Sequence, residues 1–237
     1  MALKRVLAIG AHPDDVEILC SGTLAKFVKA GHHVTIVHVT NGDVGHYFIP
    51  AEKLAEIREE EAAQAARTIG ADSIGLGVHD FGVYDDWETL HKFTDIIRQA
   101  KPDVIITHAP TDYLLEHIKV GEITIAASYA ASCPNIKTSH DFHDKIPPIF
   151  FMDTVGAIDF KPSHYVDITD VIELKREALS KHQSQLKWMK ERWGTDLLEL
   201  MESTGRSRGI QSGVKYAEAF AQYLVYGRFQ AQDLLPI

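Results

Sequence analysis

The sequence predicts an α/β fold: a Rossmann-like, doubly wound and mostly parallel sheet with helices on both faces and a C-terminal α/β extension. In its first half, short apolar runs rich in branched side chains alternate with helical patterns, which is typical of βαβ units. Right-handed crossovers then favour a strand order near 3-2-1-4-5. No repeat or linker-like change in composition interrupts the 237 residues, so we expect a single domain over residues 1–237.

The first half supplies the parallel strands. The first apolar run is short and continuous, which predicts a buried strand. Gly31 and Gly70 follow helical patterns, and Pro50 precedes one, as expected at helix ends and starts. The expected elements are strand 3–9, helix 17–30, strand 34–39, helix 51–69, strand 73–78, helix 87–100, strand 103–107 and helix 121–132.

The second half is less regular and forms the expected extension. It begins with a polar loop over residues 135–148, which contains His140 and His143. The elements that we expect after it are strands 149–153 and 165–168, a long helix 170–193, a short helix 196–203 and a last helix 216–226.

Charge, apolar runs and cysteine content disfavour several kinds of partner and location. Lys and Arg number 24 against 33 Asp and Glu, a formal net charge of −9, which disfavours binding to a nucleic-acid backbone. We find neither an apolar run near the length of a membrane span nor a signal-peptide pattern, and so expect no membrane partner. Only Cys20 and Cys133 are present, so we expect a reducing, cytoplasmic location.

Polar residues follow the carboxyl ends of the expected strands, where open parallel sheets bind their ligands. The chain has 13 histidines, and several fall at these ends. Strands one and four are neighbours in the expected order, so the residues that follow them could meet at one point. The residues at the strand ends are His12, Asp14, Asp15, Asn41, Asp43, His79, Asp80, His108, Asp112, Glu116 and His117.

Two interpretations of these residues remain open. An Asp pair after a strand often caps the next helix, and a lone histidine there is often a packing residue. Together, however, His12, Asp15 and His117 suit a catalytic zinc with an open position for water. Asp14 beside them could then act as a general base.

Five motifs resemble those of the PIG-L/LmbE-like zinc deacetylases. The most specific is Ala-His-Pro-Asp-Asp-Val-Glu at residues 11–17, directly after the first strand. The others are Thr-Asn-Gly-Asp at 40–43, Arg-Glu-Glu-Glu-Ala-Ala at 58–63, an Asp and a His five residues apart at 112–117, and His-Gln-Ser-Gln at 182–185. The resemblance therefore extends over residues 3–185.

The resemblance implies roles for individual residues. His12, Asp15 and His117 become the ligands of Zn²⁺, or of another divalent metal such as Fe²⁺. Asp14 becomes the general base and then the general acid, and Glu17 supports the first motif. The residues expected on the substrate side are Arg58, Asp43, Asp112 and His182.

One position departs from the family pattern. The second metal motif of the family reads Asp-x-His-Pro-Asp-His, whereas residues 112–117 read Asp-Tyr-Leu-Leu-Glu-His. Leu114 thus stands where the resemblance expects a histidine that stabilises an oxyanion, and leucine can donate no hydrogen bond. The candidates for the missing role are His79, His108, His182 and Arg58.

The activity that the resemblance implies is hydrolysis of an N-acetyl or other N-acyl group on a small amino sugar or sugar conjugate. An amidase acting on a thiol-sugar conjugate would use the same residues, and Leu114 leaves a non-catalytic metal-binding module open. We expect a homo-oligomer, a trimer or hexamer, as the family implies. Aromatic residues that could stack on a sugar are Tyr47, Phe48, Tyr84, Trp87 and Phe142.

Overall fold

The computed structural model describes residues 3–226 and contains one seven-stranded sheet in the order β3-β2-β1-β4-β5-β7-β6. The first five strands are parallel, and β7 pairs antiparallel with both β5 and β6. This order confirms the predicted fold class. The strands are β1 (Arg5–Gly10), β2 (His33–Thr40), β3 (Asp72–Val78), β4 (Val104–Thr107), β5 (Ile149–Met152), β6 (His164–Asp167) and β7 (Ala217–Gln222).

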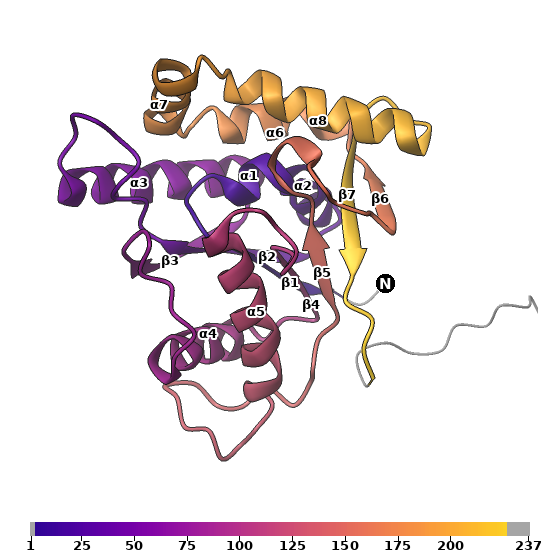
Figure 1. The fold of residues 1–237 in the computed structure, drawn as a ribbon. Helices are drawn as coiled ribbons and strands as arrows, with labels where there is room; N and C mark the ends of the chain where they lie inside the picture. The colour runs from indigo at the N-terminus through magenta and orange to yellow at the C-terminus, as the bar shows by residue number, and fades with distance from the viewer. Residues whose placement is uncertain (1–2, 227–237) are drawn as a thin grey trace, which may run out of the picture.

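Helices cover both faces of the sheet (Figure 1). The first three and the last three helices pack on one face, while α4 and α5 pack together on the other. Among the described residues, none of these helices has the length and apolar character needed to cross a bilayer. The helices are α1 (Asp15–Leu19), α2 (Ser21–Lys29), α3 (Ala51–Ile69), α4 (Trp87–Ala100), α5 (Leu115–Ala130), α6 (Ile172–Leu179), α7 (Gln183–Trp193) and α8 (Leu197–Ser212).

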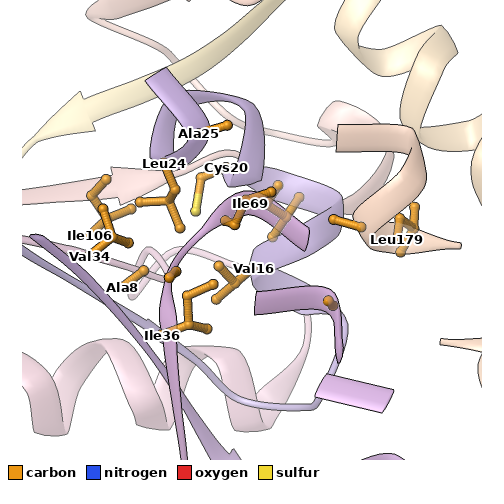
Figure 2. Packing of buried hydrophobic residues seen from close by; sticks show 14 of the residues in the cluster. Ala8, Val16, Cys20, Leu24, Ala25, Val34, Ile36, Ile69, Ile106 and Leu179 are labelled. Atoms are coloured by element: carbon orange, nitrogen blue, oxygen red, sulfur yellow. The ribbon is translucent and has the colours of Figure 1, made fainter. Parts of the chain in front are cut away.

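The strands are apolar on both sides, as a doubly covered parallel sheet requires. In β1, Val6 and Ala8 face the first layer of helices, whereas Leu7 and Ile9 face α4 and α5. Figure 2 shows the first layer, in which Leu24 and other side chains of α1 and α2 pack against the strands. Replacing the buried Leu24 by alanine would lower the free energy of unfolding by about 2–5 kcal/mol. This packing holds the carboxyl ends of β1 and β4 next to each other.

The expected last helix, 216–226, is wrong: the segment forms strand β7 instead. Its Ala and Glu residues favour a helix by propensity, but pairing on both sides with β5 and β6 outweighs that preference. The buried Glu218 of β7 also accepts hydrogen bonds from the backbone N–H groups of Gly22 (2.9 Å) and Thr23 (2.6 Å). A Cβ at Gly22 would lie only 2.9 Å from the Glu218 carboxylate, so glycine permits this approach.

The expected long helix 170–193 is two helices, α6 and α7. The chain leaves helical geometry at His182 (φ −77°, ψ 57°), and Ser184 then donates from its backbone N–H and hydroxyl to the buried Glu61 carboxylate of α3. These tertiary bonds reorient the chain at the start of α7. Boundaries differ elsewhere too: the expected helix 17–30 is broken at Cys20, α5 begins before residue 121, and α8 extends well past residue 203.

Candidate metal and catalytic site

The site lies where β1 and β4 end side by side. The chain leaves β1 at Gly10 and reaches Asp15 at the start of α1, while the loop after β4 leads to His117 in the first turn of α5. Ligand atoms of His12, Asp15 and His117 all lie within 4.8 Å of one another. The fold therefore brings together the three residues that the resemblance assigns to a metal.

The arrangement of atoms suits a cation between these three side chains. Asp15 faces both rings, with Oδ2 3.3 Å from Nδ1 of His12 and Oδ1 3.2 Å from Nε2 of His117. The Nε2 atom of His117 is buried and has no well-formed hydrogen bond, as expected of a nitrogen reserved for a metal. The donor set of two imidazoles and one carboxylate is one that zinc accepts.

Each of the two imidazoles is held from behind by a second carboxylate. Glu116 Oε2 lies 3.0 Å from Nε2 of His12, and Asp112 Oδ2 lies 3.1 Å from Nδ1 of His117. A carboxylate on the far nitrogen fixes the tautomer and orientation of a metal-binding histidine and makes it more basic. Asp112 is thus a support for His117, and it does not line the cavity described below. The sequence placed Glu116 at a strand end but assigned it no role.

These carboxylates perturb both histidines strongly. Burial opposes charge on His12, but hydrogen bonds to Asp15 and Glu116 outweigh it and raise its pKa to about 10. Burial likewise opposes charge on His117, yet the charge of Asp15 and the hydrogen bond to Asp112 raise its pKa to about 9. Excess negative charge at this point attracts protons, and it would attract a divalent cation in the same way.

A second group of possible ligand atoms shares His117. It consists of His108, Asp112 and His117, all buried. His108 stacks on His117 with ring centroids 3.8 Å apart, and its Nε2 accepts a hydrogen bond from the Ala11 backbone N–H at 3.0 Å. Neither His108 nor Asp112 lines the cavity. The group that includes His12 and Asp15 is therefore the one open to a substrate.

Asp14 lies beside this group in an unusual backbone conformation. Its φ of 134° is one that L-residues rarely adopt and costs about 1–3 kcal/mol. Arg58 of α3 holds the turn, donating from Nη2 to the Pro13 carbonyl (2.6 Å) and from Nη1 to the Gly42 carbonyl (3.2 Å). Its Nη2 is also 3.4 Å from Asp14 Oδ1. Burial raises the pKa of Asp14 to about 6, against the opposing charge of Arg58.

His182 and Asp43 lie behind the cavity wall. His182 is fully buried with Nε2 3.4 Å from Oε2 of Glu17, also fully buried. Burial opposes charge on His182, but Glu17 raises its pKa. Asp43 accepts from the Asp80 backbone N–H (3.1 Å), and its Oδ2 is 2.5 Å from Nδ1 of His79. Of the four residues expected on the substrate side, Arg58 alone lines the cavity.

The candidates for the role left by Leu114 differ in their access to the cavity. Leu114 itself borders the cavity. Burial and the neighbouring His117 lower the pKa of His108 to about 4, so this ring is neutral. His79 is directed to Asp43, and His182 lies below the surface. Arg58 is the candidate whose cationic side chain reaches the cavity wall.

The cavity has a volume of about 500 Å³ and contains Asp14 with the three possible metal ligands. Helix α7 contributes Gln185, Trp188, Met189 and Trp193 to its wall. Sequence reasoning did not assign Trp188 or Trp193 to the site, although their spacing from the motif at 182–185 places Gln185 and Trp188 on one helix face. None of the five aromatic residues expected to stack on a sugar lines this cavity, although Tyr47 contacts Trp188, which does. The five are Tyr47, Phe48, Tyr84, Trp87 and Phe142.

Together these features define an open α/β protein with a buried acid at its strand ends, beside two histidines and a carboxylate that could hold a metal ion. Residues 7–128 match the family described as PIG-L: GlcNAc-PI de-N-acetylase. The chain belongs to the PIG-L family, as its motifs predicted.

Individual relatives cover nearly the whole chain. It is 30% identical to the diacetylchitobiose deacetylase of Thermococcus kodakarensis, over 91% of this chain and 82% of that protein. The N,N'-diacetylchitobiose deacetylase from Pyrococcus horikoshii, solved with its inhibitor MPG, superposes with a TM-score of 0.82 at 28% identity, covering 93% and 84% of the two chains. The 4-carboxy-2-hydroxymuconate hydratase GalB of Pseudomonas putida superposes with a TM-score of 0.83 at 21% identity, covering 99% and 100%. The last likeness is one of fold.

Proposed function

We propose that this protein is a metal-dependent hydrolase that removes an N-acetyl or other N-acyl group from an amino sugar or a sugar conjugate. The observation that carries the proposal is the position of Asp14, a buried carboxyl group with its pKa near 6, in the same cavity as His12, Asp15 and His117. The similarity to diacetylchitobiose deacetylases supports an N-acetylated sugar as the kind of substrate.

His12, Asp15 and His117 would hold zinc, or another divalent metal such as Fe²⁺. When bound, such an ion supplies Lewis-acid polarisation of the amide carbonyl and lowers the pKa of a coordinated water. Glu116 and Asp112 keep the two imidazoles in the tautomers that leave Nδ1 of His12 and Nε2 of His117 free for the ion.

The protein's own groups manage the proton. Asp14 is ionised at neutral pH, because its pKa is about 6, and accepts the proton of the attacking water. The carbonyl carbon gains the oxygen, the C–N bond breaks, and Asp14 returns the proton to the leaving amine, giving a carboxylic acid and a free amine. The second proton of the water then passes from the acid to the amine, so that the products at neutral pH are a carboxylate and an ammonium. Arg58 fixes the strained Asp14 turn, and its positive charge at the cavity wall would stabilise an oxyanion that forms beside it.

An acetate-release assay on the metal-supplemented protein tests the proposal. N-acetylglucosamine, diacetylchitobiose and a thiol-sugar amide serve as substrates, and Asp14→Asn should retain metal while losing most turnover. His117→Ala should lower the zinc content measured by elemental analysis. Full activity of Asp14→Asn would remove Asp14 from its role, and stoichiometric metal without hydrolysis of any amide would favour a binding module.

The relatives include a second reaction class, so the same preparation needs a second assay. The 4-oxalmesaconate hydratase of Pseudomonas putida is 22% identical over 94% of this chain. Water addition to 4-oxalmesaconate without acetate release would replace the hydrolase assignment. The trimer or hexamer expected from the resemblance stays a prediction, which light scattering of the purified protein would measure.

A further inference from the structure

Beside its charged groups, the cavity with the proposed reaction centre has a large apolar wall. Its charged groups gather around His12, Asp14 and Asp15, whereas the remaining wall is built mainly of large apolar and aromatic side chains. The members of this apolar wall are Ile18, Val44, Phe81, Tyr113, Leu114, Val155, Trp188, Met189, Trp193 and Leu197. They come from six separate parts of the chain, so no single element accounts for the apolar character.

Trp188 is an aromatic residue of this wall and packs against the rings of His46 and Tyr47. It lies on the cavity face of α7 with Gln185 and Met189, which are three residues before it and one after it. The Tyr47 ring meets it edge-on with centroids 4.3 Å apart, and the Arg192 guanidinium lies 5.3 Å from the centre of the Tyr47 ring. In Figure 1, α7 lies over α3, into which the loop carrying Tyr47 leads. The indole is thus held in place by its neighbours.

Two polar groups within this wall are engaged by the protein itself. The Tyr113 hydroxyl donates to the Val155 carbonyl at 2.9 Å, and the Gln185 amide donates to the Gly45 carbonyl at 3.3 Å. Leu114 adds an apolar side chain where the family motif has a histidine. The hydroxyl groups of a second sugar ring would lose water here and regain few hydrogen bonds, which is unfavourable. Burying the surface of an apolar group against this wall would instead lower the free energy of binding.

We infer that the substrate carries an apolar group larger than methyl, which binds between Trp188 and Leu114. This inference rests on the proposed function for the amino-sugar part of the substrate. Such a group could be an extended N-acyl chain or an alkyl or aryl group attached to the sugar. The same apolar wall would recognise either group. Two series of ligands therefore distinguish them, one with N-acyl chains of increasing length and one with glycosidic groups of increasing length.

Binding without turnover gives the first test. The zinc-loaded Asp14→Asn protein is titrated by calorimetry with methyl, butyl and octyl glycosides of N-acetylglucosamine, below micelle-forming concentrations. A second series compares N-acetyl, N-butyryl and N-octanoyl glucosamine. Each buried methylene strengthens binding about three- to fourfold, so the octyl or the octanoyl compound should bind at least about 30-fold more tightly than its shortest counterpart. Equal affinities throughout both series would overturn the inference.

Substitutions of Trp188 then test whether the apolar group binds at this side chain. Trp188→Ala should remove most of the gain with chain length and leave the affinity for the methyl glycoside within about twofold, whereas Trp188→Phe should keep part of the gain. Trp87→Ala is the matched control, since this tryptophan packs on His91 outside the cavity wall. Equal weakening of short and long ligands by Trp188→Ala would also overturn the inference. These affinities do not depend on hydrolysis, so an absence of deacylation would refute the proposed function separately.

Discussion

Replacing Glu116 by glutamine tests whether this carboxylate supports His12 in the proposed metal site. The side chain is nearly buried, and its Oε2 lies 3.0 Å from Nε2 of His12. Glutamine has the same shape and keeps an oxygen to accept the hydrogen bond that the Phe81 backbone N–H donates to Glu116 Oε1 at 2.8 Å. The substitution therefore removes the negative charge behind His12 while the loop around Phe81 stays in place.

Two effects of opposite sign set the size of the change. Loss of the carboxylate partner of a metal-binding histidine weakens metal binding about 10- to 100-fold, equal to about 1.4–2.7 kcal/mol. The same carboxylate helps to raise the pKa of His12 to about 10 in the metal-free protein, so a proton competes with the metal for this ring. Removing the charge lowers that pKa and relieves part of the competition. The net weakening should therefore be larger at pH 9 than at pH 7.

Zinc affinity measured with a competing chelator at both pH values tests this reasoning. Glu122→Gln is the control, because Glu122 is a half-exposed carboxylate on the same helix that pairs with Lys119. We expect Glu122→Gln to bind zinc as the unchanged protein does. A zinc affinity of Glu116→Gln equal to that of the unchanged protein at pH 9 would show that Glu116 does not support His12.

Three further predictions concern pH and stability. Because the base must be ionised and the pKa of Asp14 is about 6, kcat/KM should fall tenfold per pH unit below pH 6; a flat profile between pH 5 and 8 would contradict this role. Arg98→Ala should lower the free energy of unfolding in urea by at least about 3 kcal/mol, because each buried acceptor left without its partner costs about 1–3 kcal/mol. The buried Arg98 guanidinium donates to five backbone carbonyls at the end of α5 and in the loop after it. Arg67→Ala, at an exposed ion pair, should change this free energy by less than about 1 kcal/mol. Burial opposes charge on both Glu17 and His182, but their pairing lowers the pKa of Glu17 and raises that of His182. The pair therefore stabilises the folded protein most between the ordinary pKa values of the two groups, about 4.5 and 6.5. This stabilisation is lost at lower pH, where Glu17 is protonated, and at higher pH, where His182 loses its proton. His182→Gln should flatten this part of the pH profile of the free energy of unfolding, measured in urea.

The parallel part of the fold was predictable because its signals are local. Runs such as Val34–Val39 are rich in branched, mostly apolar side chains, and glycines at 31 and 70 end the helices where the sequence indicates. Adjacency of β1 and β4 then follows from the usual topology, and this places His12 near His117. Strand β7 was not predictable, since its Ala-rich sequence favours a helix and becomes a strand through pairing with segments more than 50 residues away.

The sequence predicted that His12, Asp14, Asp15 and His117 lie together, as the structure shows, but it predicted less of their surroundings. The motif at residues 11–17 is specific enough to indicate a metal, an acid and their order. Asp112 and Glu116 face the far nitrogens of His117 and His12. These contacts depend on the orientation of the side chains, which the spacing of residues in the sequence does not determine. The place of Trp188 in the wall depends on the break at His182 that creates α7, and that break results from the contact of Ser184 with Glu61.

The hydrogen bonds from Gly22 and Thr23 to Glu218 have a consequence for the order of events during synthesis. Helix α2 starts two residues after α1 ends, and α1 begins at Asp15, so β7 anchors the segment that directly follows the first metal motif. Nearly 200 residues separate the two partners, and contacts of such separation form late. A nascent chain still lacking β7 would expose α2 without this anchor. The segment after the first motif therefore reaches its final packing only after β7 has been synthesised.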